Sequence, residues 1–115
     1  MEVTHRQMQR LDLLTISGRL DPVAAAKLQE EINKLFKAGH WHILLDLGQL
    51  EYISSPALRV LVSARKRARE HGRGSDRGDV RIVNLQDRVR KVFDLVGFTG
   101  LFDIYDNMVD AVASF

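Results

Sequence analysis

Polar and apolar residues alternate in the first part of the chain. Val3 to Met8 and Leu11 to Ser17 both have this two-residue period, which is typical of strands with one buried face. The turn between them falls near Gln9 and Arg10, so the two segments predict an antiparallel hairpin. Gly18 follows the second segment and is expected to end that strand.

A helix is predicted next, from Pro22 to about Ala38. Asp21 can accept hydrogen bonds from unpaired main-chain N–H groups at a helix start, and proline suits the first helical position because it has no N–H to leave unpaired. Gly39 suits the left-handed residue that often follows a helix. Apolar residues recur at helical spacing and form the predicted inner face: Val23, Leu28, Ile32, Leu35 and Phe36.

The middle of the chain predicts a central strand followed by a second helix. Trp41 to Leu47 contains consecutive apolar residues, which is typical of a strand covered on both faces. Gly48 to Ile53 is expected to be a short connector, and Pro56 to about His71 a helix. That helix has small and apolar residues on its inner side and cations on its outer side: Arg59, Arg65, Lys66, Arg67 and Arg69.

One loop and four short elements complete the predicted fold. Gly72 to Gly78 contains three glycines and is interpreted as a flexible surface loop. The elements after it are a strand, a helix, a short strand and a last helix: Val80 to Val83, Gln86 to Val96 ended by Gly97, Phe102 to Tyr105, and Asp106 to Phe115. Alternating strands and helices imply crossover connections. We therefore expect one α/β domain over residues 1–115, with a mostly parallel sheet of four to five strands, an N-terminal hairpin and about four covering helices.

Composition fits an ordinary soluble globular protein and narrows the function classes. Hydrophobic residues make up 45% and charged residues 28% of the chain. The absence of cysteine excludes disulfides, thiolate catalysis and cysteine metal sites, and it is consistent with a reducing compartment. No apolar run is long enough to span a membrane, and Met1 to Arg10 lacks a signal-peptide pattern. We expect a cytoplasmic protein that is not associated with a membrane.

Charge is unevenly distributed, although the formal net charge is only +2. The segment from Arg59 to Lys91 has 11 basic and 4 acidic residues, a balance of +7, which leaves −5 elsewhere. Such a segment could contact nucleic acid or an acidic protein surface. No aromatic residues are interleaved with its cations to stack on bases. A solvated helix face and loop is the preferred interpretation, and nucleic-acid binding is not expected.

No catalytic or metal-binding pattern is evident. The four histidines lie in different predicted elements without a carboxylate or cysteine at ligand spacing: His5, His40, His42 and His71. Neither glycine-rich nucleotide-binding motif follows a strand, and Ser54 and Ser55 lack the frame of a nucleophile elbow. We expect neither an enzyme nor a bound cofactor or metal. A nucleotide site at the open ends of the parallel strands stays as an alternative, because many α/β sheets have one there.

A pair of serines stands where the central strand leads into the second helix. Pro56 disfavours helical dihedrals at the residue before it, so Ser55 is the predicted N-cap and Ser54 the residue just before the cap. A hydroxyl at a helix start faces unpaired N–H groups and the positive end of the helix dipole, where a phosphate is favoured. The pair is therefore either a structural cap alone or also a phosphorylation switch.

Three segments occur in an order that resembles a known family. They are LxISGRLD at Leu14 to Asp21, ILLDLGQLEYISSPALRVL at Ile43 to Leu61, and VRKVFDLVGFTGLFDIY at Val89 to Tyr105. Together they resemble the STAS domain family, specifically the bacterial anti-sigma factor antagonists. The resemblance implies a small STAS-type α/β domain that binds an anti-sigma factor with serine kinase activity and thereby frees a sigma factor. Phosphorylation would shut this activity off, and ATP would be bound by the partner.

The resemblance also implies which residues act. The first serine of the family's motif is the phosphoacceptor and corresponds to Ser54, and Ser55 takes the second position. The partner-binding surface would be this neighbourhood and the turn after the second strand: Arg19, Leu20, Asp21, Pro22, Ile53, Ser54, Ser55, Pro56 and Arg59. Ile53 and Pro56 stand where the family has aspartate and glycine. The site therefore lacks a charged contact, and its helix entry is stiffer.

These two departures leave a second function open. Without the aspartate, the chain could be a phosphorylation-independent STAS subunit of a signalling complex or a lipid-transport complex. The sequence also leaves open which sigma factor pathway is served, and whether the chain forms a weak homodimer.

Overall fold

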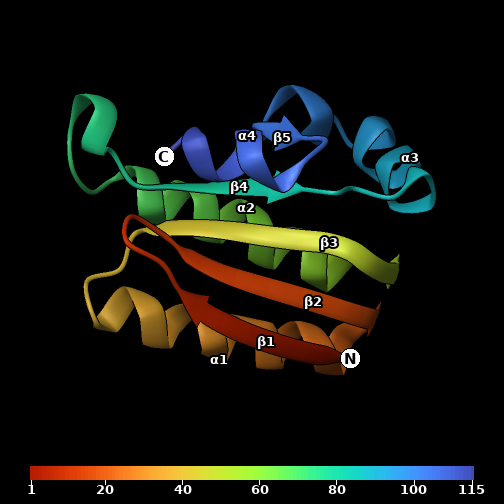
Figure 1. The fold of residues 1–115 in the computed structure, drawn as a ribbon. Coiled ribbons are helices and arrows are strands. Elements are labelled where there is room, and N and C mark those ends of the chain that lie inside the picture. The colour runs from red at the N-terminus through yellow and green to blue at the C-terminus, as the bar shows by residue number, and fades with distance from the viewer.

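The computed structural model describes residues 1–115 and contains one five-stranded sheet in the order β1-β2-β3-β4-β5 (Figure 1). The hairpin pair β1–β2 is antiparallel, and every other neighbouring pair is parallel. The strands are β1 (Glu2–Gln7), β2 (Asp12–Leu20), β3 (His42–Ile53), β4 (Asp79–Val83) and β5 (Ile104–Tyr105). The predicted mostly parallel sheet, its N-terminal hairpin and its central strand are confirmed.

Four helices cover the two faces of the sheet. They are α1 (Pro22–Lys37), α2 (Ser55–Arg69), α3 (Asp87–Leu95) and α4 (Met108–Ala113), with 3₁₀ turns η1 (Gly74–Asp76) and η2 (Phe98–Gly100). Figure 1 shows α1 and α2 behind the sheet and α4 in front of it. The last helix is shorter than predicted because Asn107, whose side chain accepts a hydrogen bond from the Asp110 N–H, begins it.

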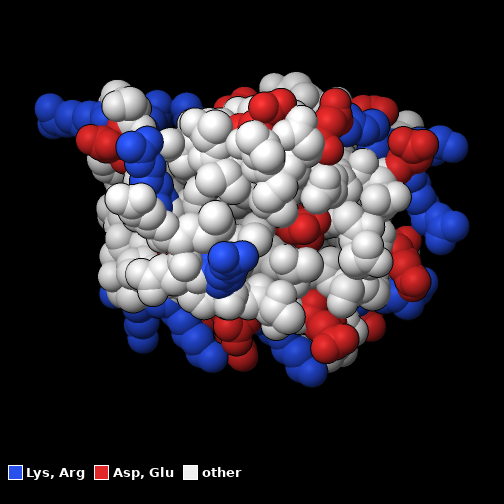
Figure 2. Space-filling model, viewed as in Figure 1, with Lys and Arg blue, Asp and Glu red and all other residues white.

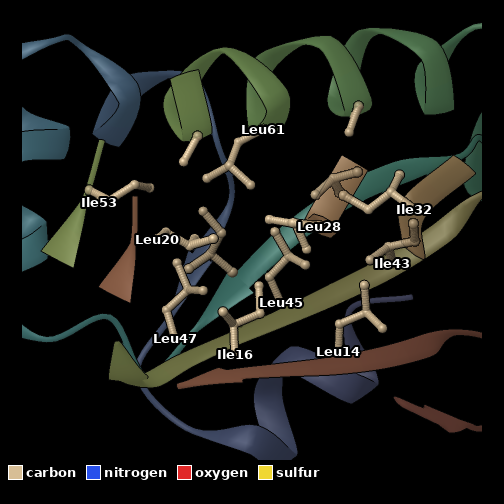
Figure 3. Close-up of a cluster of buried hydrophobic side chains, with 14 of the residues drawn as sticks. Leu14, Ile16, Leu20, Leu28, Ile32, Ile43, Leu45, Leu47, Ile53 and Leu61 are labelled. Carbon is tan, nitrogen blue, oxygen red and sulfur yellow. The ribbon is translucent and has the colours of Figure 1, made fainter. Parts of the chain in front are cut away.

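The main core lies between the sheet and the helices behind it. Figure 3 shows side chains of β2 and β3 pointing toward those of α1 and α2, among them Leu14, Ile43, Leu28 and Leu61. A smaller buried cluster lies under α4 on the opposite face: Leu11, Leu44, Val83 and Ala111. The central strand β3 therefore has apolar neighbours on both faces, which explains its unbroken apolar run.

Strands β2 and β3 extend further than the sequence predicted. Gly18 does not end β2, and the segment from Gly48 to Ile53 is not a connector, because the two strands stay paired as far as Leu20 and Ile53. Gly18 has a φ of 85°, and the pairing register shifts just beside it. It marks a bulge rather than a strand end. The extension places the starts of α1 and α2 next to each other.

The predicted inner face of α1 is wrong at Val23, which is 69% exposed. Residues three and four positions before Leu28 share its side of the helix, and these are Ala25 and Ala24, both buried. Val23 lies five positions before Leu28 and falls off that stripe. The helix therefore approaches the sheet through alanines and leaves an apolar side chain exposed beside its start.

Gly78 is fixed by packing and is not merely part of a flexible loop. Its N–H donates to the His71 carbonyl at 2.8 Å. A Cβ at this position would stand 2.2 Å from the Ala68 carbonyl oxygen and 2.8 Å from the Trp41 Cβ. A side chain is excluded here because α2 and the start of β3 approach the glycine so closely.

Gly78→Ala is accordingly expected to destabilise the protein by about 3 kcal/mol, the upper part of the range for overpacking, because the nearest clashing atom belongs to the main chain. Denaturant unfolding measures the change. Gly100→Ala is the matched control, since nothing lies within 4 Å of its Cβ, and it should change stability by less than about 0.5 kcal/mol. Equal effects of the two substitutions would contradict the packing described here.

Candidate functional site

The second helix begins one residue earlier than predicted, and this exchanges the roles of the two serines. Ser54 is the N-cap: its backbone is extended, with φ −87° and ψ 164°, and its Oγ accepts from the Ala57 N–H at 3.4 Å. Ser55 is the first helical residue and is exposed. The prediction that Ser55 caps the helix is therefore wrong. Pro56 is still within the first turn, where its missing N–H costs nothing.

Pairing with β2 explains why the cap falls on Ser54. The Ser54 N–H donates to the Leu20 carbonyl at 2.9 Å, which keeps the backbone extended up to this residue. The side chain of Ser54 is buried, with only 4% of the residue exposed. Ser54 is thus a structural cap, and Ser55 presents its hydroxyl at the surface.

The start of α1 lies directly beside this position. Asp21 caps α1, with its Oδ1 accepting from the Ala24 N–H at 2.8 Å, as the sequence predicted. The neighbouring residue Leu20 pairs with Ile53 at the ends of β2 and β3. Two helix starts therefore stand side by side at the carboxyl ends of adjacent parallel strands. The structure brings together both segments that were predicted to bind a partner.

The predicted partner-binding residues divide into exposed and buried ones. Leu20 and Ile53 are core residues, so their side chains do not reach the surface, and Ser54 is buried with them. Strand alternation turns both apolar side chains toward the helices behind the sheet, where they support the rim of the site. Arg19 and Leu20 also belong to β2 rather than to a turn after it. The remaining members are exposed or half-buried: Arg19, Asp21, Pro22, Ser55, Pro56 and Arg59.

A shallow groove of about 350 Å³ separates the first turns of α1 and α2. Its walls are mostly small or short side chains, with Pro22 and Pro56 at the helix starts and Arg59 as the charged residue. Ser55 is not part of the lining but directly precedes Pro56, which is. A partner segment can therefore approach both helix starts together without first displacing large side chains.

Two exposed residues close in sequence to these helix starts were missed at the sequence level. Tyr52 is 40% exposed, and the guanidinium carbon of Arg19 lies 4.3 Å from the centre of its ring, within the range of a cation–π contact. Val23 is the other. Tyr52 was missed because its segment was predicted to be a connector; as part of β3 it precedes the buried Ile53 and therefore faces the opposite way.

The electrostatic environment of Ser55 favours an anion. No acidic residue lies in the first turn of α2, Arg59 follows four residues after Ser55 on the same helix, and the Asp21 carboxylate at the adjacent helix start is engaged as the cap of α1. Unpaired N–H groups and the helix dipole add positive potential at the helix start.

No group of three or more acidic or histidine side chains is arranged to hold a metal ion. None of the helices combines the length and the apolar character that crossing a membrane requires.

Ser54→Ala is expected to lower the free energy of unfolding by about 1 kcal/mol, because the Ala57 N–H loses its cap. Ser55→Ala should change it by less than about 0.5 kcal/mol, since its hydroxyl caps nothing. Paired denaturant titrations measure both values. A larger loss from Ser55→Ala than from Ser54→Ala would contradict the assignment of the cap.

Comparison with known proteins places this geometry in a family. The sequence profile of the STAS domain matches residues 3–111. The chain belongs to the STAS domain family. This STAS domain is 29% identical over 115 residues to BtrV of Bordetella bronchiseptica, a protein named as an anti-sigma factor antagonist, and the match covers 100% of this chain and 95% of BtrV. It is 28% identical over 91 residues to the anti-sigma-B factor antagonist of Bacillus subtilis, with 79% and 78% of the two chains covered.

Solved structures show the same fold. A crystal structure from Thermotoga maritima, named as an anti-sigma factor antagonist, superposes on this STAS domain with a TM-score of 0.87 at 21% identity. The match covers 96% of this chain and 92% of that one. The small STAS-type α/β domain implied by the sequence motifs is thereby confirmed.

Proposed function

We propose that this STAS domain is an anti-sigma factor antagonist that binds an anti-sigma factor with serine kinase activity and thereby releases a sigma factor in the cytoplasm. The observation that carries the proposal is the pair of adjacent helix starts, with an exposed serine on one of them and a groove between them. The names of the relatives BtrV and the anti-sigma-B factor antagonist support it. ATP belongs to the partner, and this chain has a regulatory rather than an enzymatic role.

Phosphorylation at the serine pair is the proposed off-switch. Phosphoryl transfer requires a hydroxyl that can lie in line with the γ-phosphate of the kinase-bound nucleotide. Ser54 stays the residue predicted from the family motif, but its burial and its role as a cap oppose such access. Ser55 is exposed, so we include it as the rival acceptor. A phosphate adds about −1.5 to −2 charge units, which is enough to disrupt a docked surface by desolvation and repulsion.

The direct test is incubation of this chain with a cognate anti-sigma factor kinase, with and without ATP. Size-exclusion chromatography should show a complex, and intact-mass spectrometry should then show addition of one phosphoryl group. If Ser55 is the acceptor, Ser55→Ala should abolish the added phosphoryl group and Ser54→Ala should leave it in place. If Ser54 is the acceptor, the two variants should give the opposite results. Neither complex nor mass gain with a folded kinase would refute the proposal.

A second candidate function is a phosphorylation-independent STAS subunit of a larger signalling or lipid-transport complex. The observation that favours it is Ile53, which fills the family's aspartate position with a buried apolar side chain. Complex formation without phosphoryl transfer would support this candidate. In that case a negative charge at position 55 should leave partner affinity unchanged.

A further inference from the structure

A second hollow, of about 890 Å³, lies at the other end of the sheet, where β3 and β4 begin. The turn between β1 and β2, the end of α2, the loop of residues 72–78 and the last residues of the chain enclose it, and Figure 1 shows these segments gathered on the left. Its lining is polar, with Phe115 as the one hydrophobic residue. The serine pair stands at the opposite end of β3. The hollow is therefore separate from the proposed partner surface.

Four arginines line this hollow, and we call them the arginine basin: Arg10, Arg69, Arg77 and Arg81. Figure 2 shows Lys or Arg atoms extending from the left edge, where the 72–78 loop lies in Figure 1. The one acidic residue in the lining is Asp76, and its main-chain oxygen, not its carboxylate, bonds His42 Nε2 at 3.0 Å. Positive charge therefore exceeds negative charge around the opening.

The members of the basin differ in their acidic partners. Arg81 Nε lies 3.0 Å and Arg69 Nη1 3.5 Å from the buried Asp79 carboxylate, so these two cations share its one negative charge. Arg10 and Arg77 have no Asp or Glu carboxylate within 4.0 Å, but Arg10 contacts an oxygen of Phe115, the last residue of the chain. Arg77 is therefore the cation with the least compensation, and the basin as a whole keeps an excess of positive charge.

Arg77 and Arg10 each donate to a main-chain oxygen. Arg77 Nε donates to the Arg69 carbonyl at 2.8 Å, and Arg10 Nη1 donates to a main-chain oxygen of Phe115 at 3.4 Å. Each contact uses one N–H direction and leaves the remaining guanidinium donors available. A partly immobilised guanidinium loses less conformational freedom when it binds. The arrangement therefore favours an anion that accepts several hydrogen bonds.

We infer that the arginine basin binds a small anion with two or more phosphoryl groups. The guanidinium fork matches the spacing of phosphate oxygens, and several arginines around one hollow favour more than one phosphoryl group. The volume is that of a small-molecule site, whereas the polar lining excludes an apolar ligand. Duplex nucleic acid fits less well, because the basin is a hollow between loops and not an extended basic stripe.

Isothermal titration calorimetry of the full chain with sodium tripolyphosphate tests this inference. The expected result is saturable binding with a Kd below about 1 mM. The double substitution Arg10→Gln with Arg77→Gln should weaken it at least about tenfold, because the two cations of the basin that have no Asp or Glu partner are lost. The matched control is Arg6→Gln with Arg88→Gln, which removes the same charge from exposed positions outside the basin and should change Kd less than about twofold.

Stability must be compared in parallel, and the unfolding midpoints of both double variants should stay close to the parent's. Binding that weakens equally in both variants would overturn the inference, because it would reflect net charge alone. Absence of saturable binding, or tighter binding of duplex DNA than of tripolyphosphate, would also overturn it. ATP serves as a second probe and tests whether a nucleoside attached to the phosphates is accepted.

Discussion

Asp79→Ala should lower the free energy of unfolding by about 3 kcal/mol, as expected when one partner of a buried ionic cluster is removed. Asp79 is 2% exposed and begins β4. Its carboxylate lies within 4.0 Å of three guanidinium groups, those of Arg65, Arg69 and Arg81, at 3.8, 3.5 and 3.0 Å. Its Oδ1 also accepts from the Val80 N–H at 2.9 Å. No other acidic side chain is placed to compensate all three cations.

The loss arises from what the substitution leaves behind. Three arginine side chains that are 18–31% exposed would remain packed together, with only the exposed Asp103, 3.7 Å from Arg81 Nε, as a counter-charge. Arg81 would still donate to the Ser114 carbonyl and hydroxyl, so the cluster would be strained rather than released. Urea unfolding measures the change. Asp94→Ala, an exposed acid on α3 without an ion pair, is the control and should cost less than about 0.5 kcal/mol. A cost for Asp79→Ala as small as the control's would contradict the cluster's role.

Ser55→Glu should weaken binding of the anti-sigma factor at least about 100-fold, which corresponds to about 2.7 kcal/mol. A carboxylate at the exposed helix start would have to be desolvated beneath the partner. The same charge favours the helix itself, because it lies at the positive end of the dipole in a first turn that has no other acid. Stability should therefore be unchanged or slightly raised while affinity falls.

Affinity for the partner is expected to fall while stability does not. This difference distinguishes a change at the binding surface from loss of the folded structure. Fluorescence anisotropy with labelled partner measures affinity, and thermal unfolding measures stability on the same samples. Thr99→Glu places the same charge on the exposed η2 turn and is the matched control, with affinity expected within about twofold of the parent. Unchanged affinity for Ser55→Glu would favour the phosphorylation-independent subunit instead.

Local signals in the sequence were sufficient for the order of the elements and for the overall fold. Asp21 and Pro22 predicted the start of α1 correctly because capping depends on neighbouring residues only. The start of α2 could not be predicted in the same way. A long-range hydrogen bond from Ser54 to Leu20 fixes which serine ends the strand, and the preference of the residue before Pro56 is too weak to outweigh it.

Features that depend on contacts between distant segments were the ones missed. Gly18 and Gly48 suggested strand ends, but β2 and β3 continue together through a bulge because their last residues, Leu20 and Ile53, are both buried. The arginine basin joins positions 10, 69, 77 and 81, and no local pattern relates them. The exposure of Tyr52 follows from strand alternation only when its segment is known to be a strand.

The most direct test of the proposed switch is a displacement assay with a labelled sigma factor bound to its anti-sigma factor. Unmodified chain should displace the sigma factor in a dose-dependent manner. The same chain phosphorylated at the serine pair, and Ser55→Glu, should not, whereas Thr99→Glu should act like the parent. Failure of the unmodified chain to displace sigma factor from an anti-sigma factor that it binds, or equal displacement by the phosphorylated chain, would contradict the account.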